Sequence, residues 1–475
     1  MKSHLQVMKF GGTSVGDASC IARTAKIIVD AAKKARCVAV VSAMGGVTNR
    51  LIEAAKHAQA GKAAEAAAIL GELEKQHEMA LAGLGPSEGA RGPIRLKMNQ
   101  VFAEGRRLCE GTALLRELTP RTLDAISSLG ERLSAPLVAA AVRETGASSE
   151  AIEATELIVT DAFHGGAEPR MDKTREKSQA RLHLVLERGT IPVVTGFIGA
   201  TVAGDLTTLG RGGSDYSATI LGAALDADEV IIWTDVDGVL TADPRLVQDA
   251  RTIPEISYRE AAELAYFGAK VLHPKTLNPV VQAAIPVWIR NSFAPERLGT
   301  KITPQGQSIG GGVKALTAIR DVTLISVGGP GIVGLTDVVG RTFSTTAAVR
   351  ASVLLISQSS SQNDICFIVS TADAQRTVEA LRREFAQDLA HHNVEHITTD
   401  PNIAIVAVVG ENMRGTPGIA GRTFSALGRD GVNLIAIAQG SSESNISFVI
   451  EEKAVKTALL TTHREFGLGT QQNGS

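Results

Sequence analysis

Short apolar runs alternate with helical stretches through the first 300 residues. The runs lie at 5–10, 37–42, 191–195, 229–233 and 286–290. After the first of them, Ile21, Ala25 and Ile28 recur at helical spacing. Uninterrupted apolar runs of this length are typical of strands that are buried on both faces. The pattern therefore predicts an open, mostly parallel α/β sheet with helices on both faces.

Two stretches break this alternation. Residues 50 to about 128 are rich in Ala, Leu, Lys and Glu, which predicts a helical subdomain with a turn near 83–93. Residues 291–312 are rich in Gly, Pro, Ser and Thr, so we expect a domain boundary there.

Beyond that boundary the chain repeats itself. Residues 322–369 align without a gap onto 403–450, and the sequence GRTFS at 340–344 recurs at 421–425. Each copy predicts a strand, a helix and two further strands, followed by a helix at 373–386 or 452–464. Two copies are too few for a solenoid. We expect a pair of small βαββαβ modules that pack together.

Composition agrees with this picture. The chain has 475 residues, 44% of them hydrophobic and 21% charged, which is typical of a soluble protein with several domains. Its net charge of −2 argues against a general nucleic-acid or membrane-surface binder. The four cysteines have no metal-ligand spacing, and no apolar signal or spanning segment is found, so we expect a cytoplasmic protein.

Glycine turns follow several predicted strands, at Gly11-Gly12, Gly45-Gly46, Gly196 and Gly210–Gly213. Glycine lets backbone N–H groups close on an anion, and ligands bind at the carboxyl ends of parallel strands. These turns favour a phosphate-rich ligand such as a nucleotide, although each alone is also explained as a simple turn. The sequence contains no GxxxxGK[ST] and no GxGxxG spacing at the first turn.

Charged residues accompany these glycines. Arg211 lies between glycines, where a guanidinium suits a carboxylate ligand, while Asp215 is explained equally well as a helix cap. Lys9 should project opposite Met8 and Phe10, toward the glycine turns, unless it is an ordinary exposed lysine. Lys270 presents the same alternatives. The acidic stretch 234–245 is either a solvated turn or a binding site for ribose, for magnesium-bound phosphate, or for both.

Seven motifs, in order along the chain, resemble those of the aspartate kinases. They are KFGGTSV at 9–15, VTN at 47–49, GERLS at 130–134, TGFIG at 195–199, TTLGRGGSD at 207–215, the stretch 234–245 and GAKVLHP at 268–274. The C-terminal repeats resemble the paired ACT domains of the same enzymes. The resemblance implies an amino-acid-kinase catalytic domain at 1–300, a linker at 301–320, and ACT domains at 321–400 and 401–475.

The resemblance also implies the site residues. It implies catalytic roles for Lys9, Gly11, Gly12 and Asp215; aspartate binding by Thr48, Glu131, Phe197, Arg211, Gly213 and Ser214; and ATP binding by Lys9, Gly12, Ser14, Thr234, Asp235, Leu240, Asp243, Arg245 and Lys270. ATP is the co-substrate, and Mg²⁺ is expected chiefly on its phosphates rather than in a protein cage. Leu240 stands where similar enzymes often have Tyr near the nucleotide base.

The ACT pair implies an amino-acid effector and a homodimer or larger homo-oligomer. Leu354 replaces the acidic residue of lysine-sensitive relatives, and the patterns Ile356-x-Gln358 and Ile437-x-Gln439 resemble threonine-sensitive enzymes. Threonine is therefore favoured over lysine, unless the two glutamines only satisfy backbone groups.

The same half resembles the kinase portion of kinase–homoserine dehydrogenase fusions, so the chain is either monofunctional or part of a longer protein. A kinase for glutamate or N-acetylglutamate and an inactive amino-acid sensor are the competing functions.

Overall fold

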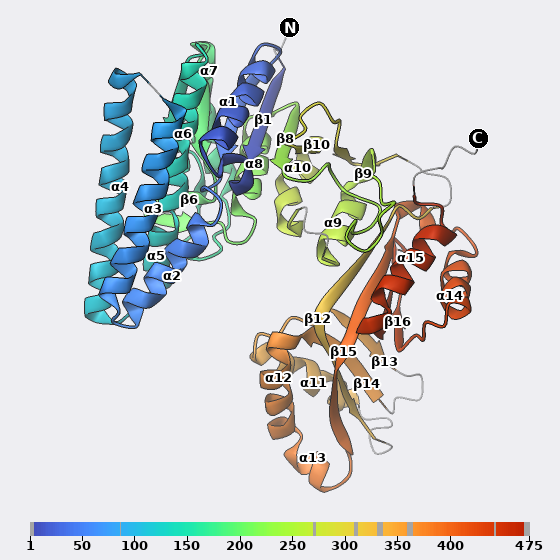
Figure 1. The fold of residues 1–475 in the computed structure, drawn as a ribbon. Helices are drawn as coiled ribbons and strands as arrows, with labels where there is room; N and C mark the ends of the chain where they lie inside the picture. The colour runs from blue at the N-terminus through green and yellow to red at the C-terminus, as the bar shows by residue number, and fades with distance from the viewer. Residues whose placement is uncertain are drawn as a thin grey trace, which may run out of the picture. The chain divides into compact units, whose positions relative to one another are not determined.

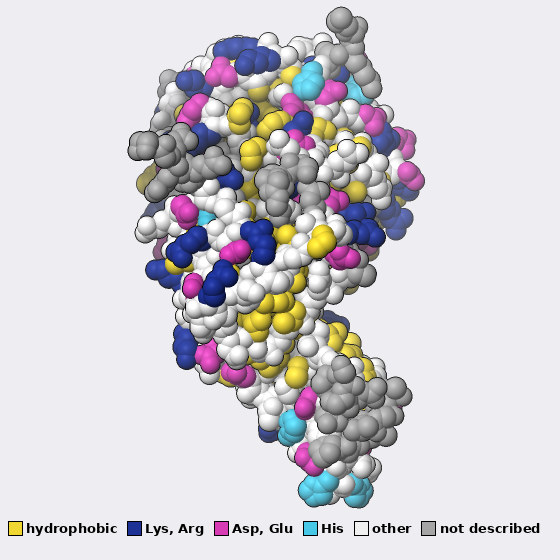
Figure 2. Space-filling model, turned by 90° about the vertical axis from the view of Figure 1, so that its right-hand side faces the viewer, with side chains coloured by type: hydrophobic (Ala, Val, Ile, Leu, Met, Phe, Trp, Pro, Cys, Tyr) yellow, Lys and Arg dark blue, Asp and Glu magenta, His cyan; other side chains and the backbone are white. Residues whose placement is uncertain are grey.

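The computed structural model describes residues 4–85, 87–268, 272–307, 312–329, 336–358, 364–440 and 443–469. The chain divides into two compact units. The first contains residues 1–239, 254–261 and 271–306, and the second contains 240–253, 262–270 and 307–475. None of the described helices is long and apolar enough to cross a membrane. Acidic and basic side chains lie interspersed over the face shown in Figure 2.

The first unit is built on an eight-stranded sheet in the order β3-β5-β2-β1-β8-β10-β11-β9. Its strands are β1 (Leu5–Phe10), β2 (Arg36–Val41), β3 (Ser149–Ile152), β5 (Ile191–Thr195), β8 (Glu229–Thr234), β9 (Glu255–Ser257), β10 (Val287–Asn291) and β11 (Thr300–Thr303). All neighbours are parallel except β10 and β11. The predicted mostly parallel sheet is confirmed, and the five apolar runs are β1, β2, β5, β8 and β10.

Helices cover both faces of this sheet (Figure 1). On one face, α1 (Ala18–Ala32) packs on β2 and α6 (Leu129–Glu144) packs on β2, β3 and β5. On the other, α7 (Met171–Glu187) packs on β5, and α8 (Gly213–Ala224) packs on β1, β2 and β8. Smaller elements are η1 (Gly12–Val15), η2 (Ala154–Glu156), α9 (Tyr258–Tyr266), η3 (Pro274–Leu277), α10 (Asn278–Ala283) and a three-stranded sheet of β4 (Val159–Thr160), β6 (Ile198–Thr201) and β7 (Leu206–Thr208).

Residues 47–127 form a helical layer against α1 and α6. It consists of α2 (Val47–Gln59), α3 (Ala63–Leu84), α4 (Glu88–Leu115) and α5 (Pro120–Ser127). Apolar side chains of these helices join the strands in one buried cluster, which includes Leu51, Leu70 and Phe102. Because α2 begins directly after Gly46, this layer fixes the glycine turn that follows β2.

The second unit is a six-stranded antiparallel sheet in the order β13-β14-β12-β15-β17-β16. Its strands are β12 (Ala315–Gly328), β13 (Leu355–Gln358), β14 (Asp364–Ser370), β15 (His396–Val409), β16 (Ala436–Ala438) and β17 (Asn445–Glu451). Its helices are α11 (Thr336–Ala348), α12 (Thr371–Glu384), α13 (Ala386–Ala390), α14 (Ile419–Arg429) and α15 (Val455–Glu465), with the short η5 (Glu411–Met413) and η6 (Glu452–Ala454).

Equivalent contacts confirm the repeat. In the first copy Phe343 packs edge-on against Phe367, and in the second Phe424 packs edge-on against Phe448. The matching arginines also make the same contacts: Arg341 pairs with Glu384 at 2.7 Å and Arg422 pairs with Glu465 at 3.0 Å. The repeat therefore extends through the final helix of each copy.

The second copy is not continuous in sequence. β12 and β15 pair along their whole lengths across irregularities near Val322. Residues 315–319 of β12 pair with 405–409 of β15, so the strand before the first copy completes the second. The stretch 240–253 also belongs to this unit, because Ala242 and Val247 lie in the hydrophobic cluster of the second copy. The second unit thus takes residues 240–253 from within the expected catalytic domain, and its second copy takes residues 315–319 from the expected linker.

Candidate active site

A cavity of about 360 Å³ lies in the first unit where glycine turns converge. It is lined by Lys9, Gly12, Ser42, Ala43, Met44, Gly45, Gly46, Thr48, Asn49, Glu131, Phe197, Gly210, Arg211, Gly212, Gly213, Ser214 and Asp215. These residues come from the end of β1, the turns after β2 and β5, the start of α6 and the loop before α8. The cavity thus brings together all six residues expected to bind aspartate, with Lys9, Gly12 and Asp215.

Lys9 provides the buried positive charge of this cavity. As predicted, it points away from the side of β1 that carries Met8, since Met8 lines a different cavity. Its Nζ lies 2.5 Å from Oδ1 of Asp215, and the whole residue is only 8% exposed. Asp215 lies in the first turn of α8, where the helix N-terminus favours an anion. The lysine is therefore held in place by a carboxylate rather than by solvent.

Close backbone packing explains the glycines around Lys9. A Cβ on Gly12 would lie 3.0 Å from the carbonyl oxygen of Ala43, and one on Gly213 would lie 2.6 Å from the Phe197 ring. Gly212, which caps α8, has φ of 70°, in the left-handed region that favours glycine. The turns approach one another so closely that a side chain at Gly12 or Gly213 is excluded.

Phe197 adopts a conformation that is unusual for its residue type. Its φ is 69°, and it is held there because its N–H donates to Ser217 Oγ at 2.9 Å and its carbonyl accepts from Leu209 N at 2.9 Å. A non-glycine residue in this region costs about 1 kcal/mol or more. Such residues cluster at functional sites, so the strain agrees with a role for Phe197 in shaping the cavity.

Glu131 is a buried carboxyl group in the same cavity. It is 3% exposed, and burial raises its pKa to about 8. Backbone hydrogen bonds, the Lys9 charge and Ser214 oppose this rise without overcoming it. Its Oε2 has no hydrogen-bond partner among the residues that the structure describes. A buried acceptor of this kind is complementary to a cationic group of a ligand.

Arg211 lies at the exposed rim of the cavity. No carboxylate of the described residues is paired with it within salt-bridge distance. Its charge contributes to lowering the pKa of His273, although burial of that imidazole is the larger cause. The cavity wall therefore holds two cations, Lys9 and Arg211, and two carboxyl groups, of which Asp215 is paired with Lys9 and Glu131 has an oxygen without a partner among the described residues. That set matches an amino acid with two carboxylates and one ammonium group.

Four predicted residues lie next to this cavity rather than in its wall. Gly11 donates its N–H to the carbonyl oxygen of Trp233 at 3.2 Å, which ties the first glycine turn to the end of β8. Ser14 is buried, and its hydroxyl contacts Ser292 Oγ at 2.8 Å. Thr234 ends β8 and Asp235 follows it, exposed. β1 and β8 are neighbours, so these residues share one edge of the sheet.

The remaining residues expected to bind ATP are not in the first unit. Leu240, Asp243 and Arg245 belong to the second unit, where the backbone N–H, Nε and Nη2 of Arg245 all donate to the Asp243 carboxylate. The pKa of Asp243 is lowered, chiefly by the hydrogen bond from Arg245. Lys270 lies outside the described residues.

Asp124 was missed by the sequence reasoning. It is 2% exposed and accepts hydrogen bonds from His164 Nδ1 at 2.9 Å, Gly165 N at 3.1 Å and Thr208 Oγ1 at 2.5 Å. These bonds hold the strand that leads into the Arg211 loop. The available signal was a carboxylate inside the short apolar stretch Leu123–Ile126, where an unpaired charge would be costly.

The four residues expected to bind an effector lie in the second unit. Ile356 and Gln358 are on β13, and Ile437 is on β16 with Gln439 directly after it; all four are exposed. β13 and β16 form the two edges of the sheet and yet lie near each other. Asp364, unexplained by sequence, lies 3.1 Å from His396 and packs over Gly328.

No group of His, Cys, Asp and Glu that could hold a metal ion is found among the described residues. Asp215, a carboxylate of the cavity wall, is paired with Lys9.

Comparisons with protein families agree with this architecture. The model of the amino acid kinase family matches residues 4–291, and the model of the ACT domain matches 325–385 and 406–466.

Several known proteins are similar over nearly the whole chain. A bifunctional aspartokinase/homoserine dehydrogenase of Haemophilus influenzae is 33% identical, over 97% of this chain and 56% of its own length. The chain thus spans about half the length of such bifunctional relatives. The chloroplastic aspartokinase 1 of Arabidopsis thaliana is 33% identical, over 97% of this chain and 80% of its own length.

Solved structures of Escherichia coli aspartokinase III are also similar. The complex with aspartate and ADP is 30% identical, has a TM-score of 0.81, and is matched over 98% of this chain and 100% of that one. The complex with lysine and aspartate is 30% identical with a TM-score of 0.80, over 97% and 99% of the two chains.

Proposed function

This chain belongs to the aspartokinases of the amino acid kinase family, with C-terminal ACT domains, and from this we propose that it transfers the γ-phosphoryl group of ATP to the β-carboxylate of L-aspartate. The product is 4-phospho-L-aspartate. The observation that carries the proposal is the single cavity that joins Lys9, Glu131 and Arg211.

Each of the three charges has a proposed partner on aspartate or on the phosphoryl group. Arg211, whose guanidinium is unpaired among the described side chains, binds the α-carboxylate. Glu131, with its unpartnered Oε2, accepts from the α-ammonium group. Thr48, Phe197, Gly213 and Ser214 shape the pocket around the substrate. This arrangement leaves the β-carboxylate as the group that faces Lys9.

Transfer then depends on charge and alignment. The β-carboxylate is ionised at neutral pH, so no general base is required. It must approach a phosphoryl group that is itself negative, and catalysis of such transfers is mainly positioning and electrostatic stabilisation. Lys9 neutralises charge on the transferring group, and Asp215 positions Lys9. The amide of Gly12 contacts the phosphate, while Gly11, whose N–H donates to the carbonyl oxygen of Trp233, holds the turn in place. ATP is proposed to be bound by Ser14, Thr234, Asp235, Leu240, Asp243, Arg245 and Lys270.

An ADP-release assay tests the acceptor. With MgATP, we expect turnover with aspartate and at least about a hundredfold lower kcat/KM with glutamate or N-acetylglutamate, because one extra methylene displaces the reacting carboxylate from Lys9. A preference for glutamate would contradict the proposal and favour the first competing function. Absence of turnover with all three acids, while aspartate still binds, would favour an inactive sensor.

For regulation we propose threonine as the effector, bound beside the Ile-x-Gln patterns of β13 and β16. The support is that both patterns are exposed and lie on neighbouring edge strands. Lysine is the competing effector, since E. coli aspartokinase III has been solved with lysine. We also propose that two copies of this chain associate through their ACT domains.

A thermal-shift scan with threonine, lysine, isoleucine and methionine checks the effector. A ligand at about 100 times its Kd stabilises the native state by about 2.7 kcal/mol, so threonine should raise Tm by several degrees. The shift should disappear in Gln358→Ala/Gln439→Ala and persist in the control Gln375→Ala, which is exposed on α12. A shift with lysine alone would refute the threonine assignment.

A further inference from the structure

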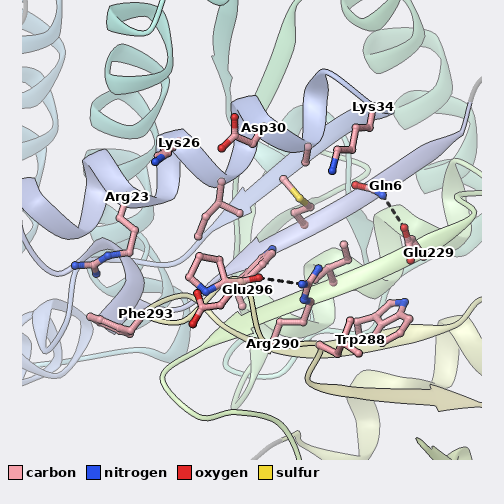
Figure 3. A pocket seen from close by; sticks show the side chains of 17 residues that line it. Gln6, Arg23, Lys26, Asp30, Lys34, Glu229, Trp288, Arg290, Phe293 and Glu296 are labelled. Atoms are coloured by element: carbon pink, nitrogen blue, oxygen red, sulfur yellow. Dashed lines mark hydrogen bonds between the residues drawn. The ribbon is translucent and has the colours of Figure 1, made fainter. Parts of the chain in front are cut away.

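A second, larger cavity of about 740 Å³ lies on the opposite face of the eight-stranded sheet from Lys9 (Figure 3). Its floor is formed by Met8 on β1, by Ile231 and Trp233 on β8, and by Trp288 on β10. One wall is α1, and the other is the loop from Phe293 to Leu298. The volume is in the range of small-molecule sites, and the floor is mainly apolar, as in most such sites.

Two buried donors in this cavity lack acceptors. Trp233 is 4% exposed, and its Nε1 has no hydrogen-bond partner among the described residues. The Arg290 guanidinium stacks 4.9 Å from the centre of the Trp233 ring. Its Nη2 donates to the carbonyl oxygen of Pro295 at 3.0 Å, while its Nε is buried and, within the described chain, has no acceptor. A buried donor without an acceptor is destabilising, so two of them in contact point to an absent acceptor.

The charge around the cavity favours an anion. Arg23 and Lys26 project from α1, and Lys34 lies in the turn just after it; none of the three has an ion pair among the side chains that the structure describes. The acidic residues are mostly occupied: Glu229 accepts from His4 and Gln6, and Asp30 pairs with Lys33 at 2.7 Å. Glu296 is an exposed carboxylate on the outer loop. Positive charge is therefore available next to the two unsatisfied donors.

Aromatic surface completes the site. Trp288 lines the cavity, and Phe293 is 46% exposed with Arg23 4.6 Å from its ring centre. Planar rings stack well on such surfaces. We propose that this cavity binds a small molecule with a planar apolar body and one acidic group, which accepts hydrogen bonds from Trp233 Nε1 and Arg290 Nε. This site is separate from the proposed catalytic cavity and does not depend on the proposed kinase activity.

The two tryptophans of the chain, Trp233 and Trp288, both line this cavity, which allows a direct test. The probes are 1-anilinonaphthalene-8-sulfonate and N-phenyl-1-naphthylamine, which share an aromatic body and differ in the sulfonate. Energy transfer from excited tryptophan to the bound probe is measured during titration of the intact protein. We expect saturable transfer with the sulfonate probe and binding at least about tenfold weaker for the neutral one, because a charged hydrogen bond contributes about 1.5–3 kcal/mol.

Variants locate the binding. Arg290→Met should remove the preference for the sulfonate, and Lys26→Met/Lys34→Met, on the exposed rim, should weaken it severalfold without affecting folding. The control is Lys177→Met, an exposed lysine on α7, which packs on the other face of the sheet and does not line the cavity. Aspartate with MgADP should leave the titration unchanged.

Equal affinity for the two probes, or displacement by aspartate with MgADP, would overturn the proposal. A third outcome would also overturn it: probe binding that appears only when the protein is diluted, together with a dimer that Trp288→Leu dissociates. The cavity would then be a contact between two copies of the chain.

Discussion

Replacement of Lys9 by methionine is expected to lower kcat by roughly 10²–10³-fold, with a much smaller change in the KM for aspartate. The side chain supplies the buried positive charge of the cavity, and removing one preorganised electrostatic contact of this kind has effects of that size. Methionine keeps the length and apolar contacts of the lysine stem, so the substitution removes mainly the charge. Steady-state ADP release at saturating MgATP measures the loss.

Loss of stability must be separated from loss of catalysis in this variant. Lys9→Met leaves Asp215 without its partner at 2.5 Å, and an unpaired, largely buried carboxylate destabilises the fold. The double variant Lys9→Met/Asp215→Asn removes both charges and should recover most of the Tm while remaining inactive. Lys33→Met, at an exposed pair with Asp30 just after the end of α1, is the control for loss of a lysine charge. Turnover within threefold of wild type in Lys9→Met would contradict the role given to Lys9.

Glu131→Gln is expected to raise the KM for aspartate by about 10- to 100-fold above about pH 8, with the KM for MgATP nearly unchanged. Glutamine is isosteric but cannot provide the negative charge that the α-ammonium group requires, and hydrogen bonds to charged groups contribute about 1.5–3 kcal/mol. Initial rates against aspartate concentration at several pH values measure the effect. Equal rises in both KM values would instead indicate a general distortion of the cavity.

The raised pKa of Glu131 also gives this variant a distinctive pH dependence. The group titrates at about 8 in the folded protein and near 4.5 in the unfolded chain, so between these values the folded state binds the extra proton. The free energy of unfolding of the ligand-free wild type therefore falls as pH rises through this window, by up to about 1.4 kcal/mol per unit. The Glu131→Gln variant has no such cost, because a glutamine side chain does not ionise.

Wild type and Glu131→Gln should therefore have similar Tm at about pH 5, and the variant should be the more stable at about pH 8.5. Aspartate binding to wild type should release a proton below pH 8, so its affinity should rise with pH and level off above 8. A stability difference that is independent of pH would show that Glu131 is ionised in the free protein.

The position of Lys9 could be predicted from the periodicity of a strand, whereas the other site residues were expected from the resemblance to the aspartate kinases. The alternation of Met8, Lys9 and Phe10 along one strand was enough to place Lys9 on the side of the glycine turns. The apolar runs gave the five longer strands of the first sheet, whereas β3, β9 and β11 are edge or near-edge strands of three or four residues with little pattern of their own.

Features that depend on contacts between distant segments could not be predicted. The bonds from Asp124 to Gly165 and Thr208 join residues about forty and eighty positions apart. The pKa of Glu131 is raised by burial, and a sequence motif does not indicate how deeply a side chain is buried. Thr234 and Asp243 belong to one sequence motif, yet they lie in different units of the structure. The reason is that Ala242 and Val247 pack with the second ACT copy.

The way β12 completes the second ACT copy has a consequence for biosynthesis. Residues 315–319 leave the ribosome before the first copy, but their partners at 405–409 are made only after it. The first copy is thus nested inside the second, and it has all of its own strands once β15 begins. Until synthesis passes residue 409, the start of β12 is an unpaired edge of the kind that promotes misassociation between nascent chains. The nested topology therefore makes the order of translation part of how the regulatory half assembles.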